Sequence, residues 1–145
     1  MAAEKNAQVT WRGDLATGRG MIERVGSGAF ASLGVSWPAR TGDEADLTSP
    51  EELIAAAHAA CFSMALSGGL TEKGNAPESL TVSATVTFVP GTGITKSALD
   101  VIGNVPRIDD AAFHEACERA KENCPVSKAL QGNVEITVTA RLAPS

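Results

Sequence analysis

A long apolar segment in the middle of the chain constrains the fold more than any other feature. From Leu53 to Leu66 nearly every residue is apolar or small, and neither Gly nor Pro occurs between Pro50 and Gly68. Such a composition has a high helix propensity. Because the apolar residues are not confined to one stripe, we expect a central helix that is buried on most of its faces.

The residues that flank this segment predict where the helix begins and ends. Ser49 is a candidate N-cap, Pro50 takes the first helical position, and Glu52 lies three residues after the cap, as in a capping box. Gly74, followed by Pro77, is typical of a helix C-terminus.

Length, composition and charge narrow the class of protein. The chain has 145 residues, which predicts a single domain over residues 1–145. A net charge of −5 provides no positive surface for nucleic acid or an anionic membrane. The N-terminus has no basic start followed by an apolar run, so we expect no signal peptide. The most apolar part of the central helix, about 14 residues, is shorter than the roughly 20 that span a bilayer. We therefore expect a cytoplasmic protein.

The other segments predict strands and two further helices. The strand predictions rest on alternating apolar and polar residues and on turn signals, and they cover residues 7–12, 21–25, 29–37, 79–89, 94–105 and 133–142. Pro38 is expected to end the third strand, and a polar connection over residues 39–48 follows it. A helix capped by Asp109 and a short one from Pro125 to Leu130 precede the last strand. This order predicts an α+β fold in which antiparallel sheets pack around the long helix.

The chain has three cysteines, which do not form a recognisable metal-binding or disulfide pattern. No CxxC pair occurs, so we expect no zinc site. Cys117 falls on the predicted apolar stripe of the helix after Asp109, together with Ala112, Phe113, Ala116 and Ala120. We interpret Cys117 as a packing residue.

Cys124 and Cys61 are the candidate reactive thiols. Cys124 immediately precedes Pro125 at a predicted helix start, where free N–H groups lower a thiol pKa; a cysteine without a function at a helix cap is equally compatible with the local sequence. Cys61 lies inside the apolar helix, and burial raises a thiol pKa unless a cation compensates. The candidate partners of Cys61 are Arg40, Arg19 and His58. A histidine on such a helix is more often a hydrogen-bonded core residue than a catalytic base.

Glu51 is the candidate acidic residue. Glu52 already has a structural role in the capping box, whereas the plain role of Glu51 is to complement the positive end of the helix dipole. Glu51 and Cys61 are ten residues apart, about 15 Å along a straight helix. If both belong to one active site, we expect Glu51 to come from a second subunit.

Two motifs centred on cysteines are similar to those of a known family. The runs SPEELIAAAHAACFSMALS and CPVSKAL, with QVTWRGDLATGRG at the start and ITKSAL in the middle, closely resemble the OsmC/Ohr family of thiol-dependent peroxidases, and its OsmC branch in particular. The resemblance covers almost the whole chain. It implies an OsmC-like α+β fold and an intertwined homodimer with its active sites at the subunit interface.

The resemblance also implies roles for individual residues. Cys61 matches the peroxidatic cysteine, Cys124 the resolving cysteine and Glu51 the family glutamate. The family arginine matches Arg40, with Arg19 in reserve. The implied substrates are organic hydroperoxides and, more weakly, hydrogen peroxide; the implied reductant is a lipoyl-type or other dithiol, and no cofactor or metal is required.

Two other functions use the same residues differently. A redox sensor or thiol-disulfide regulator would oxidise the same cysteines slowly and act on a partner protein. A non-catalytic dimeric module would contain Cys61 only as a core residue with an unreactive thiol.

Overall fold

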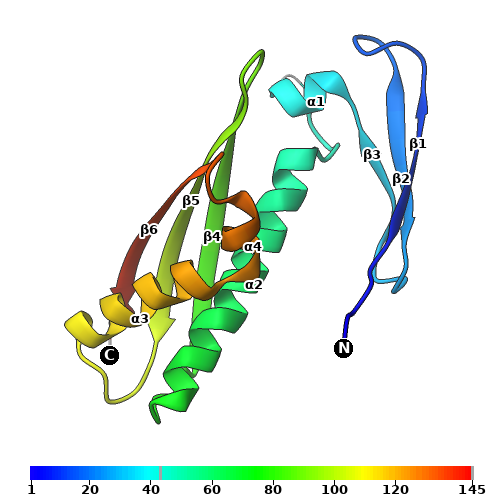
Figure 1. Cartoon of the computed structure of the whole chain (residues 1–145). Coiled ribbons are helices and arrows are strands. Elements are labelled where there is room, and N and C mark those ends of the chain that lie inside the picture. Colours follow the sequence, from blue (N-terminus) through cyan, green and yellow to red (C-terminus); the bar gives the residue numbers. More distant parts are fainter. Residues whose placement is uncertain (43, 145) are drawn as a thin grey trace. The chain divides into compact units, whose positions relative to one another are not determined.

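The computed structural model describes residues 1–42 and 44–144. The chain divides into two compact units, Met1–Leu53 and Ile54–Ser145 (Figure 1). Within the polar connection predicted over residues 39–48, residue 43 lies outside the described residues.

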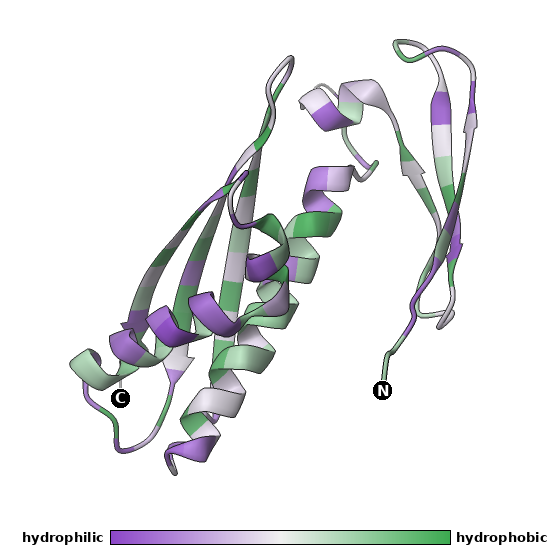
Figure 2. Ribbon diagram, in the orientation of Figure 1, coloured by the Kyte–Doolittle hydropathy of each residue, from purple (hydrophilic) through white to green (hydrophobic). Residues whose placement is uncertain are grey.

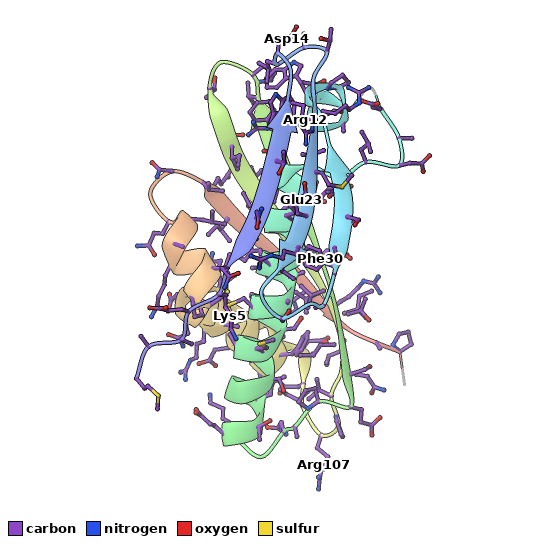
Figure 3. The ribbon with its side chains drawn as sticks, turned by 90° about the vertical axis from the view of Figure 1, so that its right-hand side faces the viewer. Lys5, Arg12, Asp14, Glu23, Phe30 and Arg107 are labelled. Carbon is purple, nitrogen blue, oxygen red and sulfur yellow. The ribbon has the colours of Figure 1, made fainter. Side chains whose placement is uncertain are left out.

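The first unit contains an antiparallel three-stranded sheet. Its strands are β1 (Ala7–Arg12), β2 (Arg19–Val25) and β3 (Ala31–Val35), in that order across the sheet. Figure 3 shows Asp14 in the turn between β1 and β2, and Glu23 on β2. The strand predicted over residues 7–12 is confirmed, the second begins two residues earlier than predicted, and the third is shorter at both ends.

A short helix, α1 (Trp37–Thr41), follows β3 where the sequence predicted the end of a strand and a polar connection. The hydroxyl of Ser36 accepts a hydrogen bond from the Ala39 N–H at 3.0 Å and so caps the helix. Pro38, which we expected to end a strand, lies in the first helical turn, where proline's missing N–H costs nothing. The prediction for residues 36–41 was therefore wrong, and the reason is a serine cap that was not recognised.

The central helix α2 (Pro50–Glu72) begins as predicted. Its Glu52 N–H donates to the Ser49 hydroxyl at 3.1 Å. The Glu52 carboxylate accepts a hydrogen bond from Thr48 Oγ1 at 3.0 Å, so only one half of the predicted capping box is formed.

The observed α2 is longer than the apolar segment that the sequence analysis considered. At 23 residues, with a mean hydropathy of 1.6 over its most apolar window, α2 is long and apolar enough to cross a membrane. The expectation that it is too short was wrong, because the helix continues through Gly68 and Gly69 to Glu72. Length and composition alone do not distinguish such a helix from the core helix of a soluble protein.

The ribbon of α2 is coloured mostly as hydrophobic along its length (Figure 2). In the second unit its residues form one buried and one exposed stripe. One is fully buried and consists of His58, Phe62, Leu66 and Leu70. The other is exposed and consists of Ala56, Ala60, Met64 and Gly68. Met64 is 73% exposed. Only 22% of the apolar window is buried within the described chain, so the predicted burial on most faces is not supplied by this chain alone.

The sheet of the second unit has mixed pairing. Its order is β4 (Ser79–Val89), β5 (Gly93–Asn104) and β6 (Glu135–Leu142). The predicted antiparallel hairpin of β4 and β5 is confirmed. The prediction of antiparallel sheets was wrong for β6, which pairs with β5 in parallel. Between β5 and β6 the chain passes through α3 (Asp110–Asn123) and α4 (Pro125–Leu130), and parallel strands need such a crossover.

The core of the second unit lies between α2, α3 and the β4–β6 sheet (Figure 1). The cap predicted for α3 is confirmed, since the Asp109 carboxylate accepts the Ala112 N–H at 2.8 Å. Phe113, Cys117 and Ala120 are buried as the predicted stripe requires, whereas Ala112 is exposed. The buried core residues are Phe62, Leu66, Leu70, Leu99, Val101, Val105, Phe113, Cys117, Ala120 and Cys124.

Candidate active site

Arg40 and Glu51 form an ion pair within the first unit. Arg40 Nε lies 3.0 Å from Glu51 Oε1 and 3.1 Å from Oε2, and its Nη2 lies 2.9 Å from Oε2. The guanidinium carbon also lies 6.0 Å from the centre of the Trp37 ring, one turn earlier in α1. The Glu51 side chain is only 8% exposed and that of Arg40 30%. The last turn of α1 and the first turn of α2 thus position a charge-assisted pair.

Arg19, the reserve candidate, has a different partner. Its Nη2 lies 2.9 Å from Glu44 Oε1, and the Arg19 side chain is 56% exposed. The other oxygen of Glu44 accepts a hydrogen bond from the Ser36 hydroxyl at 2.6 Å. The pairing with Glu51 therefore belongs to Arg40.

Cys61 and Cys124 are brought into contact in the second unit, 63 residues apart in the sequence. Cys61 comes from the middle of α2 and is partly exposed, whereas Cys124 is fully buried at the N-cap of α4. Both are free thiols, and each shifts the pKa of the other. The geometry therefore joins the two candidate thiols that the sequence singled out.

The two thiols differ in how easily they ionise. Burial opposes ionisation of Cys124, but the polar groups of Ser127, Cys61 and Val126 around its sulfur outweigh this effect, and the pKa of Cys124 is lowered. Burial raises the pKa of Cys61, and the neighbouring Cys124 raises it further. Within this pair, the thiolate thus forms first on Cys124. The prediction of a favoured thiolate at this helix start agrees with these contacts.

His58, another candidate partner of Cys61, hydrogen-bonds to two serines. Its ring is fully buried, with Nδ1 2.7 Å from Ser97 Oγ and Nε2 2.8 Å from Ser127 Oγ. Burial lowers the pKa of His58, which favours the neutral imidazole. These contacts match the interpretation of a hydrogen-bonded core histidine.

Cys117 is the third thiol and is 1% exposed on α3. Burial raises its pKa to about 12. It packs among core residues, as predicted. In the described part of the chain, His, Cys, Asp and Glu side chains do not gather in threes or more in a way that could hold a metal ion.

Comparison with known proteins identifies the family. A family model described as OsmC-like protein matches residues 42–139, which is more than half of the chain. The chain belongs to the OsmC family. It is 40% identical over 139 residues to the "Peroxiredoxin OsmC" of Escherichia coli K12, covering 94% of this chain and 96% of that protein. It is 30% identical over 99 residues to the "Organic hydroperoxide resistance protein" of Xanthomonas axonopodis pv. citri, covering 68% and 70%.

Solved structures have the same OsmC/Ohr fold. The organic hydroperoxide resistance protein OhrB of Bacillus subtilis is 28% identical, with a TM-score of 0.66, and the match covers 94% of this chain and 98% of OhrB. A putative organic hydroperoxide resistance protein of Vibrio cholerae, with captopril in one of its active sites, is 25% identical with a TM-score of 0.73; the match covers 97% and 94%. The OsmC-like α+β fold predicted from the sequence is confirmed.

Sequence analysis missed Ser97 and Ser127. Ser127 lies three residues after Cys124, and this spacing at a helix start could have suggested a hydroxyl near the thiol. Ser97 had no such signal, because a serine on a predicted strand alternates with apolar residues like any solvent-facing one.

Proposed function

We propose that this OsmC-family protein is a two-cysteine thiol peroxidase that reduces organic hydroperoxides and, more weakly, hydrogen peroxide. The observation that carries the proposal is the contact between a partly exposed Cys61 and a buried Cys124. The names of the relatives, a peroxiredoxin and an organic hydroperoxide resistance protein, support the same chemistry.

In the first step the Cys61 thiolate attacks one oxygen of the hydroperoxide. The O–O bond breaks, the S–O bond forms, and the alcohol leaves after taking up a proton. Cys61 is thereby oxidised to a sulfenic acid. The apolar neighbours of Cys61 on α2 favour an alkyl hydroperoxide over hydrogen peroxide as the substrate.

This step needs a cation, because burial and Cys124 both raise the pKa of Cys61. We assign that role to Arg40, which Glu51 holds through both carboxylate oxygens. A guanidinium beside Cys61 would favour its thiolate and orient the peroxide oxygens. Arg40 would thus reverse the order of ionisation within the cysteine pair.

In the second step Cys124 resolves the sulfenic acid. The Cys124 thiolate attacks Cys61 Sγ, the S–S bond forms, and hydroxide leaves as water after protonation. A cellular dithiol, such as a lipoyl group, then reduces the disulfide in two exchange steps and is itself oxidised to a disulfide. The site so assigned consists of Cys61, Cys124, Arg40 and Glu51.

The assembly and location are further parts of the proposal. The exposed stripe of Ala56, Ala60, Met64 and Gly68 supports a homodimer in which two copies of α2 pack together, because small residues allow two helices to approach closely. Such a dimer, with intertwined subunits and active sites at their interface, would complete the burial of α2. We place the protein in the cytoplasm.

The test is peptide-mapping mass spectrometry after one equivalent of cumene hydroperoxide, without reductant. A Cys61–Cys124 disulfide that forms within seconds while Cys117 stays free is the expected result. In Cys124→Ser, Cys61 should form a sulfenic acid that dimedone traps, and in Cys61→Ser no cysteine should react. Cys117→Ala is the matched control and should behave like the unmodified protein. A reduced Cys61 after this treatment would overturn the proposal.

A kinetic experiment distinguishes a peroxidase from a redox regulator. With excess dihydrolipoamide, stopped-flow measurements should show repeated turnover of cumene hydroperoxide by the wild type. Cys124→Ser should react once and then stop. Slow oxidation without repeated turnover in the wild type would instead favour the regulator.

A further inference from the structure

A row of buried polar side chains runs through the second unit and ends at Cys124. Ser97 on β5 lies 2.7 Å from His58 Nδ1, and Ser127 on α4 lies 2.8 Å from His58 Nε2. Ser97 and His58 are fully buried, and Ser127 is 3% exposed. Burying three polar groups in an apolar core is costly unless each is hydrogen-bonded, and here each has a partner. The hydrogen-bonded row is therefore a specific feature of this fold and not a by-product of apolar packing.

The row reaches a candidate reactive sulfur. Ser127 is the third residue of α4, whose N-cap is Cys124, and the polar groups of Ser127 help to lower the pKa of the Cys124 thiol. His58 therefore hydrogen-bonds to a residue that neighbours Cys124 in the first turn of α4. The titratable groups near this end of the row are Cys61 and His58 on α2, and Lys121 and Glu122 on α3, which line a pocket together with Ser127.

Counting donors determines the tautomer of His58 when Cys124 is a thiolate. The Ser127 hydroxyl has one proton, and a thiolate at Cys124 is stabilised when that proton is donated to its sulfur. Its oxygen can then only accept from His58, so Nε2 must carry the imidazole proton. A neutral ring with N–H at Nε2 has its lone pair at Nδ1, which accepts from the Ser97 hydroxyl. The hydrogen bonds therefore run in one direction from Ser97 to Cys124.

We infer that His58 is a positioning residue, whose Nε2–H holds the Ser127 hydroxyl as a donor to the Cys124 thiolate. In the opposite tautomer the Ser127 hydroxyl would donate its proton to His58 Nε2. That hydroxyl could then no longer donate to the Cys124 sulfur. His58 is not a general base, because its burial lowers its pKa and disfavours the imidazolium. This inference depends on the proposed function in one respect: the resolving role of the Cys124 thiolate comes from that proposal.

The first experiment measures the ionisation of Cys124 directly. In a Cys61→Ser background, the ultraviolet absorbance of the thiolate is titrated with pH; Cys117, with a pKa of about 12, does not interfere at lower pH. His58→Leu and Ser127→Ala should each raise the pKa of Cys124 by about one unit, the effect of one lost hydrogen bond to a charged group. His58→Gln retains both a hydrogen-bond donor and an acceptor, so the pKa of Cys124 in this variant should lie close to the wild-type value. An unchanged pKa in Ser127→Ala and His58→Leu would overturn the inference.

A second measurement does not depend on whether these variants fold. Nitrogen-15 NMR of the wild-type, reduced protein reports which ring nitrogen of His58 carries the proton. The chain has two histidines, so His114→Gln assigns the signals. At a pH where Cys124 is a thiolate we expect the Nε2–H tautomer. The Nδ1–H tautomer under that condition would overturn the inference.

A third measurement separates this inference from the proposed function. With Cys61 intact, His58→Leu should form the Cys61 sulfenic acid at the wild-type rate but form the disulfide more slowly, on the order of tenfold at a pH below the raised pKa. His58→Gln should recover the wild-type rate. If no sulfenic acid forms even in the wild type, the proposed function fails, while the titration and the tautomer still decide the role of His58.

Discussion

The guanidinium of Arg40 holds both carboxylate oxygens of Glu51, with three nitrogen–oxygen distances between 2.9 and 3.1 Å. The two residues come from neighbouring helix ends, the last turn of α1 and the first turn of α2. Glu51 is almost completely buried, so the pair is shielded from the solvent screening that weakens exposed ion pairs. An arginine fixed in this way has few alternative positions, which suits a residue that orients a substrate.

Replacing Arg40 should impair peroxide reduction far more than replacing Arg19. Arg40→Met removes the proposed cation and should lower kcat/KM for cumene hydroperoxide on the order of 100-fold, the usual effect of losing one electrostatic stabiliser. Arg19→Met breaks the exposed pair with Glu44 and should change kcat/KM little. Stopped-flow kinetics of both variants would test this. A large loss in Arg19→Met with none in Arg40→Met would reassign the arginine.

Stability at alkaline pH should depend on Cys117. Its folded pKa of about 12 lies above the ordinary value of 9.0, so the folded state retains this proton while the unfolded state loses it. The contribution is fully present below pH 9 and is lost as the pH rises towards 12. The unfolding free energy should therefore fall by up to about 1.4 kcal/mol per pH unit in that range because of this thiol.

Urea unfolding in the presence of reductant, at several pH values on both sides of pH 9, measures this slope. The chain has no tyrosine, so no phenol ionises in the same range. Cys117→Ala is the comparison and should show a smaller slope. Equal slopes in the two proteins would contradict the prediction.

Gly103 should tolerate no side chain, because β5 passes close to an aromatic ring of α3. A Cβ at this position would lie 2.5 Å from Phe113 Cζ and 2.7 Å from its Cε1. Phe113 is fully buried, so its ring can shift only by displacing other core side chains. Gly103→Ala should therefore destabilise the fold by about 1–3 kcal/mol.

The matched control is Gly69→Ala in α2, where a Cβ meets no atom of this chain within 4 Å. Alanine is the better helix former, so this variant should be as stable as the wild type or more stable by up to about 1 kcal/mol. Thermal unfolding compares the two variants. A loss of stability in Gly69→Ala but not in Gly103→Ala would show that the tight contact is not at Gly103.

The start of α2 should depend on the Ser49 hydroxyl. Ser49→Ala removes the acceptor of the Glu52 N–H and should cost about 1 kcal/mol of stability. The control is Thr71→Ala near the other end of the helix, where the hydroxyl donates to the Ser67 carbonyl four residues earlier. That bond contributes little to helix stability, so Thr71→Ala should be nearly neutral. Chemical denaturation measures both, and equal losses would exclude a capping role for Ser49.

Local signals predicted several elements well. The bounds of β1 and β4 and the starts of α2, α3 and α4 follow from alternation and from caps such as Ser49 and Asp109, which act over three or four residues. The helix α1 was missed because Ser36 is a cap of the same kind inside a segment that alternates like a strand. The error arose because a helix-cap signal and a strand-like alternation occur in the same short segment.

Interactions between distant segments were harder to predict. The parallel pairing of β6 with β5 depends on the path of the crossover through α3 and α4, and a strand pattern does not encode direction. The burial of α2 on one stripe only, within the described chain, likewise depends on what packs against it.

The sequence by itself determined the family, the fold class and the candidate residues Cys61, Cys124, Arg40 and Glu51, because short motifs and helix signals are local. Tertiary structure decided that Arg40 pairs with Glu51 and that the thiols of Cys61 and Cys124 meet. It also decided that His58 hydrogen-bonds to Ser127, in the helix that Cys124 caps. The reason is that hydrogen bonds and pKa shifts arise from groups within a few ångströms, and the chain brings together residues as far apart as His58 and Ser127 only when its core packs.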